Sequence, residues 1–79
     1  MNWRERISID PKIHHGKPCI KGTRVPVSVI VGSIADGDTP EQIMQSWPQL
    51  TAEDITAALK FAAKAAERAD VAALHSDAE

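Results

Sequence analysis

The stretch TPEQIMQSWPQLTAED, residues 39–54, contains two helix starts with one helix stop between them. At the first start, Thr39 is a favourable N-cap and Pro40 suits the first helical position. Gln42 is spaced to return a hydrogen bond to the N-cap backbone, which completes a capping box. The sequence therefore predicts a helix from residue 40, with an apolar face made of Ile43, Met44 and Trp47.

Pro48 ends this first helix, because proline disfavours helical backbone at the residue before it. Thr51 caps the next helix, and Glu53 and Asp54 in its first turn stabilise the positive helix end. The core stripe expected for this helix is Ile55, Leu59 and Ala62, with Phe61 adjacent. Two helices joined by so short a connection predict a helix-turn-helix, provided that another helix precedes them.

A preceding helix is indicated by apolar residues at helical spacing, namely Val27, Ile30, Val31 and Ile34. Gly37 follows them and supplies a C-terminal cap. Gly32, inside the segment, weakens the helix by roughly 1 kcal/mol relative to alanine. We therefore expect Gly32 to mark close packing by a neighbouring element.

The segment before this helix has the composition of short strands and turns. Ile7 and Ile9 lie on one face of a strand, which the following Asp-Pro pair stops. The stretch CIKGTRVPV, residues 19–27, predicts two short strands around a turn in which Gly22 adopts a positive φ. Pro26 cannot donate a ladder hydrogen bond, so the second strand ends there or lies at an edge.

These elements predict a mostly α-helical single domain over residues 1–79, with short N-terminal β-strands followed by a three-helix helix-turn-helix unit. The β-hairpin segment covers residues 6–26, the three-helix unit residues 27–72, and a disordered tail residues 73–79. From about Ala63 the alanine-rich sequence offers little to bury, so we expect fraying or a partner contact there.

The composition predicts a small core. The 79 residues are 43% apolar, but much of this fraction is alanine and only three residues are aromatic. A chain of this size buries only about 60% of its unfolded surface, so we expect a homodimer. The single cysteine, Cys19, indicates a cytoplasmic protein. No apolar run approaches the about 20 residues of a membrane span, and no signal peptide is evident.

The charge is unevenly distributed along the chain. Residues 1–26 carry six cations against two acids, whereas residues 27–79 carry three cations against nine acids. The basic segment of residues 1–26, called the basic front below, could bind nucleic acid or an acidic partner protein. Equally, the two halves could neutralise each other in a homodimer, and the charge pattern leaves these alternatives open.

Patterns that would predict catalysis, a metal or a cofactor are incomplete. Gly16-Lys17 lacks the upstream glycine and the following Ser or Thr of a phosphate loop. His14, His15 and Cys19 would need His75 to complete a zinc site, and that spacing fits no structural zinc pattern. We therefore expect a protein that is not an enzyme and holds no metal or cofactor, with solvated loop histidines and a buried thiol.

A helix-turn-helix raises the question of DNA binding. The acids Glu53 and Asp54 at the start of the third helix would repel phosphates, so that helix is poorly suited to be a DNA recognition helix. The basic residues of the front would have to contact the phosphates instead. The expected DNA-binding residues are Arg4, Arg6, Lys17, Lys21 and Arg24, with Lys60 as a lesser contributor. The alternative is that the three helices are only a scaffold.

Taken in order, several motifs resemble the domain of unknown function 433 family. They are Gly16-Lys17-Pro18, Gly22-Thr23-Arg24, Val25-Pro26-Val27, Gly37-Asp38-Thr39, Glu41-x-Ile43 and Trp47-Pro48-Gln49-Leu50-Thr51. The resemblance covers about residues 7–63. Members often have Cys/Ser-Gly-Gly before Lys-Pro, whereas this chain has His14-His15-Gly16.

The resemblance implies a homeodomain-like three-helix domain preceded by short strands. It also implies a VapB-like antitoxin, a class often encoded beside a PIN-like ribonuclease toxin.

We interpret residues 16–27 as a structural clasp that pairs strands across two chains. Thr23 is expected to bond to local backbone, and Arg24 to bind a carboxylate of a second subunit. The residues expected in this dimer or partner clasp are Ile7, Ile9, Ile20, Thr23, Arg24 and Val25. The alternative is a solvated surface hairpin with no special partner.

The leading hypothesis is an antitoxin-like regulator that homodimerises, neutralises a PIN-like toxin and represses its own operon by binding operator DNA. One alternative is a helix-turn-helix DNA-binding regulator without a toxin partner. Another is a protein-interaction module without DNA affinity.

Overall fold

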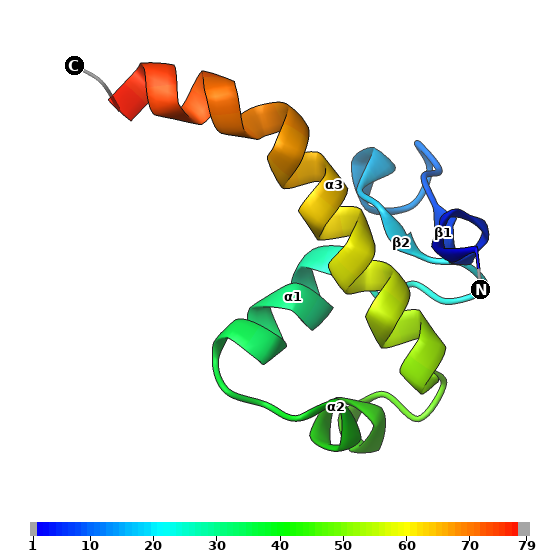
Figure 1. Cartoon of the computed structure of the whole chain (residues 1–79). Coiled ribbons are helices and arrows are strands. Elements are labelled where there is room, and N and C mark those ends of the chain that lie inside the picture. Colours follow the sequence, from blue (N-terminus) through cyan, green and yellow to red (C-terminus); the bar gives the residue numbers. More distant parts are fainter. Residues whose placement is uncertain (1, 78–79) are drawn as a thin grey trace.

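Three helices follow an N-terminal segment of short strands and 3-10 turns (Figure 1). The computed structural model describes residues 2–77, with the side chains of residues 2–68. The elements are η1 (Trp3–Arg6), β1 (Ile7–Ser8), η2 (His14–Gly16), β2 (Cys19–Ile20), α1 (Val27–Ala35), α2 (Pro40–Ser46) and α3 (Ala52–Asp77). The prediction of a mostly helical fold with a short N-terminal sheet is confirmed.

The rest of the chain packs against α3. Figure 1 shows α1 and α2 on one side of this helix and the N-terminal segment, with β1 and β2, on the other. The buried core consists of Ile20, Val25, Val27, Ile30, Ile43, Leu50, Ile55 and Ala58. Trp47 and Phe61 are only partly buried against it. Aliphatic side chains therefore fill the described core.

The two strands pair antiparallel, with Ile7 opposite Ile20. The predicted second strand of the 19–27 hairpin does not form. That segment contributes a bridge between Cys19 and Pro26 and two hydrogen bonds, from the Ile20 N–H to the Val25 carbonyl at 3.0 Å and from the Val27 N–H to the Pro18 carbonyl at 2.9 Å. Pro26 has no N–H to extend a ladder, and the helix begins at the next residue. β1 pairs along the other edge of β2, where the Lys21 N–H donates to the Arg6 carbonyl at 2.8 Å.

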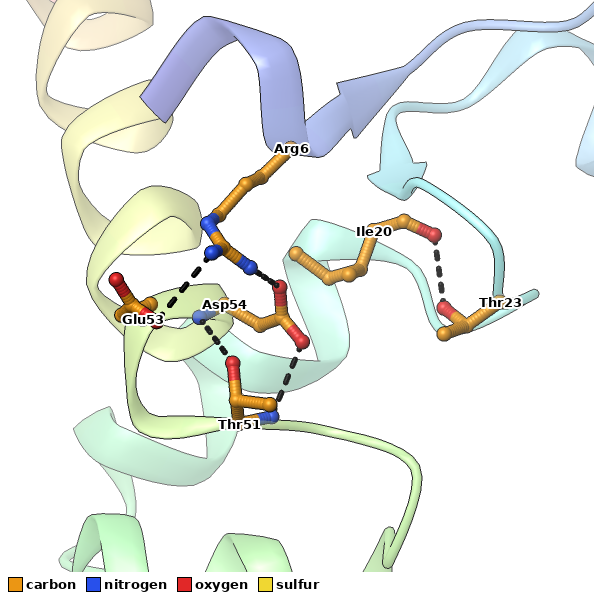
Figure 2. Close-up of polar contacts among 6 residues, drawn as sticks. All are labelled: Arg6, Ile20, Thr23, Thr51, Glu53 and Asp54. Atoms are coloured by element: carbon orange, nitrogen blue, oxygen red, sulfur yellow. Dashed lines mark hydrogen bonds and ion pairs between the residues drawn. The ribbon is translucent and has the colours of Figure 1, made fainter. Parts of the chain in front are cut away.

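The predicted turn after β2 is confirmed. The Thr23 N–H donates to the Ile20 carbonyl at 3.0 Å, and Gly22 between them has φ +82°. Such an angle at the third position of the turn is typical of a type II turn and favours glycine. The Thr23 hydroxyl also donates to the Ile20 carbonyl at 2.8 Å (Figure 2). It accepts from the Val25 N–H at 3.1 Å. Thr23 therefore bonds to local backbone, as predicted.

The predicted C-terminal cap of α1 at Gly37 is also confirmed. The Gly37 N–H donates to the Ile34 carbonyl and the Asp38 N–H to the Ser33 carbonyl, both at 3.0 Å. With Gly37 at φ +100°, these two bonds form a Schellman motif.

The expectation of close packing at Gly32 is wrong. A methyl group built on this residue would meet no heavy atom within 4 Å. Gly32 is exposed, so no neighbour explains a glycine in this helix.

Both predicted helix starts are confirmed. At α2, the Thr39 hydroxyl accepts from the Gln42 N–H at 3.2 Å, and the Gln42 side chain accepts from the Thr39 N–H at 2.8 Å. At α3, the Thr51 hydroxyl accepts from the Asp54 N–H at 3.2 Å, and the Asp54 carboxylate accepts from the Thr51 N–H at 3.0 Å. Trp47 is the C-cap of α2, so the predicted stop before Pro48 also holds.

The core stripe predicted for α3 is partly wrong. Ile55 is buried, but Leu59 is 38% exposed, whereas Ala57 and Ala58 are fully buried. α3 is packed by α1 and by η1. Its buried face is therefore wider than one stripe, and small alanines let both neighbours approach.

α3 continues to Asp77, past the predicted end of the three-helix unit at residue 72. Of the predicted disordered tail, residues 78–79 lie outside the described residues. Within residues 2–77, no helix combines the length and the apolarity that crossing a membrane requires.

Candidate functional site

The N-terminal segment is joined to the start of α3 by a polar network around Arg6 (Figure 2). One guanidinium nitrogen donates to Asp54 Oδ1 at 3.0 Å, and another donates to Glu53 Oε1 at 3.3 Å. Asp54 is only 7% exposed, and its second oxygen accepts from the Thr51 N–H. Arg6 and the helix cap thus satisfy both oxygens of a buried carboxylate, as burial of a charge demands.

This network bears on two predictions. The sequence placed Arg6 among the DNA-binding residues, but here its guanidinium is engaged by two carboxylates, so it is not a free phosphate ligand. The contact expected between Arg24 and a carboxylate of a second chain stays a prediction. Within this chain Arg6 binds two carboxylates, so part of the charge asymmetry is neutralised intramolecularly.

The other predicted DNA-binding residues lie on separate elements. Lys17, Lys21 and Arg24 are exposed on the loops either side of β2. Arg4 lies on η1, with its guanidinium carbon 4.5 Å from the centroid of the Trp3 ring. Lys60 is exposed on α3. The loops around β2 therefore bring three of the six predicted cations to one part of the chain.

Most of the predicted clasp residues serve the chain's own fold. Ile20 and Val25 are 1% and 2% exposed in the core, and Ile7 packs against that core. Thr23 bonds within its turn. Ile20 and Val25 therefore cannot contact a second chain while the core is intact, and the prediction that they join two chains is wrong. Arg24 and Ile9 remain exposed, Ile9 at 59%.

The first loop has an unusual backbone. His14, His15 and Gly16 have φ of +50°, +58° and +89°, so three successive residues are left-handed. Left-handed backbone favours glycine, so the two histidines adopt a conformation that is uncommon for residues with a side chain. The His14 ring bonds to the Arg24 carbonyl at 3.0 Å, and the buried Cys19 thiol donates to the Lys17 carbonyl at 3.4 Å. The buried thiol was predicted; the contact of His14 was not.

An open groove of about 580 Å³ lies between the N-terminal segment and α3. Its apolar lining consists of Trp3, Ile7, Ile9 and Phe61, and its basic lining of Arg4, Lys64 and Arg68; Ala65 completes it. Trp3 meets Phe61 edge to face, with ring centroids 6.2 Å apart and the planes at 81°. None of these eight described residues is acidic. The groove is therefore suited to apolar side chains with negatively charged neighbours.

The sequence predictions missed this groove. Trp3 and Phe61 are 58 positions apart, and Phe61 was placed beside the core stripe. The available signal was the spacing of Phe61, Lys64, Ala65 and Arg68, which puts them on one face of a helix. The same reasoning treated the helix from about Ala63 as a region with little to bury. The groove exists because η1 packs against α3, and the sequence offered no pattern for that contact.

Among the described residues, no group of three His, Cys, Asp or Glu side chains is placed to hold a metal ion.

Comparisons with known proteins agree with this architecture. A family model described as Protein of unknown function (DUF433) matches residues 7–62. The uncharacterised protein y4eO of Sinorhizobium fredii (strain NBRC 101917 / NGR234) is 41% identical over 59 residues, which are 75% of this chain and 27% of y4eO. The crystal structure of a DUF433 member protein from Anabaena variabilis ATCC 29413 is similar with a TM-score of 0.74 and 32% identity, over 82% of this chain and 64% of that chain.

This chain therefore spans about a quarter of y4eO and less than two thirds of the Anabaena protein. The match to the family model covers more than half of the residues, and it contains both strands, α1, α2 and the first turns of α3. A member of known structure has the same fold. On these grounds the chain belongs to the DUF433 family.

Proposed function

We propose that this chain is an antitoxin-like regulator that binds and neutralises a PIN-like ribonuclease. The observation that carries the proposal is the open groove, where Ile9 is 59% exposed beside Trp3 and Phe61. Exposed apolar side chains gathered in a groove with polar surroundings are typical of a protein-binding surface. The ribonuclease as partner comes from the resemblance to VapB-like antitoxins.

The start of α3 disfavours DNA binding by the three-helix unit in the manner of a homeodomain. A homeodomain-like unit would place the first turns of α3 in the major groove of DNA. In this chain those turns carry Glu53 and Asp54, and Arg6 is bonded to both. Glu53 remains 61% exposed at its side chain, so negative charge faces solvent where phosphates would approach. The proposal therefore assigns toxin binding to the groove and operator binding, if any, to the exposed cations around β2.

The proposed regulator is a cytoplasmic homodimer. Because the predicted clasp is largely used within one chain, its dimer interface would have to involve other exposed surfaces. Light scattering at tens of micromolar is the direct measurement. The proposal expects twice the 8.6 kDa chain mass, and a folded monomer would refute this part of it.

The test of neutralisation uses the reading frame that adjoins this chain's gene. If it encodes a PIN-like ribonuclease, we expect its induction to stop bacterial growth and co-expression of this chain to restore it. A purified mixture should show less ribonuclease activity than the nuclease alone. Absence of such a neighbour, or growth arrest that the chain does not relieve, would overturn the proposal.

A second candidate is a helix-turn-helix regulator without a toxin. It is favoured by the exposure of Lys17, Lys21 and Arg24 around β2. Fluorescence anisotropy with the DNA upstream of the gene tests it across a salt series. Alanine at both Lys17 and Lys21 should flatten the log–log salt slope by about 2 per protomer, since fewer counterions are released. Glu53→Gln should leave affinity equal or higher. An unchanged slope in the double variant would exclude these phosphate contacts.

A further inference from the structure

We propose that the groove binds a short amphipathic helix of a partner protein, with apolar residues facing the apolar lining and acidic residues facing the basic lining. That this partner is a ribonuclease rests on the proposed function; the chemistry of the bound segment rests on the groove itself.

The wall formed by α3 has the shape that a second helix requires. Phe61, Lys64, Ala65 and Arg68 follow one another at steps of three, one and three residues, so they form one stripe along the helix. The stripe is about 10 Å long, or two turns. Ala65 is small and lies within it, so another helix axis could approach to the usual 8–10 Å. A helix docked along α3 would thus lie parallel to an existing ridge.

The opposite wall supplies apolar surface that the chain itself does not cover. Ile9 is the most exposed of the large apolar side chains described, at 59%, against 37% for Val29 and 38% for Leu59. Trp3 also lines the groove and meets Phe61 of α3 edge to face. Aromatic surface beside an exposed isoleucine favours insertion of aliphatic side chains, the mode by which helices bind in grooves.

The charge of the groove lining determines which charge is favourable beside the apolar stripe of the partner helix. The basic lining contributes three cations and the described lining contains no acid. Lys64 has an ion pair with Glu67 at 3.7 Å, but both side chains are more than half exposed, at 55% and 67%. Exposed pairs of this kind are weak, so a carboxylate of the partner can compete for Lys64. The groove therefore prefers acidic flanks over basic ones.

Two other occupants fit less well. A second copy of this chain would have to present its own acids, and Asp36, Asp38 and Glu41 lie on α2 and the loop before it. None of the described exposed large apolar side chains belongs to that segment, so it would leave the apolar lining of the groove unfilled. DNA would find cations here, but it offers no aliphatic side chain for the apolar lining.

Most of the groove lining lies outside the part of the chain that matches the family model. Five of the eight lining residues, namely Trp3, Arg4, Lys64, Ala65 and Arg68, lie outside the 7–62 segment that matches the family model. The shared fold thus supplies the frame, and the flanking residues of this chain supply most of the surface that would select its partner.

The test uses two synthetic helical peptides of equal length and identical leucine stripe, one flanked by glutamates and the other by lysines. Fluorescence anisotropy measures their binding to the full chain. We expect the glutamate peptide to bind at least about tenfold more tightly. Ile9→Ser should weaken that peptide several-fold, whereas Val29→Ser, on α1 and outside the groove, should not. Glutamine at both Lys64 and Arg68 should reduce the preference for glutamate flanks.

Equal binding of the two peptides would overturn the proposal, and so would equal effects of the Ile9 and Val29 variants. If Ile9→Ser instead converts a dimer to a monomer in light scattering, the groove holds a second copy and the proposal is again wrong. The peptide assay contains no ribonuclease. Peptide binding without growth rescue would therefore refute the proposed function alone, and rescue without peptide binding would refute this inference alone.

Discussion

At the scale of single residues, Arg6 has the greatest effect on how the chain is interpreted. From the sequence it is one of several cations in a basic front. In the structure it holds the buried Asp54 and the exposed Glu53, and so attaches η1 to the first turn of α3. A residue counted as a ligand for DNA is thus a contact within the fold.

Arg6→Ala should destabilise the protein by about 1–2 kcal/mol, because it leaves a buried carboxylate with fewer donors while the arginine itself is a third exposed. Urea unfolding followed by circular dichroism measures the change. Glu53→Gln is the matched control and should cost less than about 0.5 kcal/mol, since Glu53 is largely solvated. Equal effects of the two variants would show that the Asp54 contact has no special weight.

Gly22→Val should destabilise by about 1–3 kcal/mol. The space around Gly22 is open, so the cost comes only from the positive φ that a β-branched residue adopts poorly. Gly22→Asn is the control, because asparagine tolerates left-handed backbone. Thermal melting that is unchanged in the valine variant would mean that the turn adapts without strain.

At the scale of elements, local signals predicted helix boundaries well. Capping residues bond to residues only three positions away. Thr39, Gln42 and Thr51 therefore form the expected bonds regardless of the rest of the fold. Burial was predicted less well. Leu59 is exposed whereas Ala57 and Ala58 are buried. Which residues of α3 are buried depends on where α1 and η1 contact it, and helical spacing in α3 alone does not contain that information.

Gly32→Ala should stabilise the protein by roughly 1 kcal/mol. Alanine has the higher helix propensity, and the added methyl meets no atom within 4 Å. A rise in the urea midpoint with an unchanged slope checks this. Destabilisation would indicate that an unseen neighbour, such as a partner chain, packs at that position and would restore the packing role first expected for Gly32.

At the scale of the whole molecule, short strands followed by three helices could be predicted, whereas the groove could not. The order follows from caps, turns and apolar spacing that are local in sequence. The groove depends on residues near position 3 meeting residues near position 61, and no local pattern specifies such a contact. The burial of two predicted clasp residues, Ile20 and Val25, could not be predicted for the same reason: it depends on how the N-terminal segment packs on the helices.

Isothermal titration of this chain with the PIN-like ribonuclease proposed as its partner tests the central claim most directly. The wild-type chain should bind, Ile9→Asp should weaken binding at least about tenfold, and Val29→Asp should bind as the wild type does. Circular dichroism of each variant confirms that the fold is retained, which the exposure of both residues favours. Equal affinities for the wild type and Ile9→Asp would contradict the claim that the groove is the surface where the partner binds.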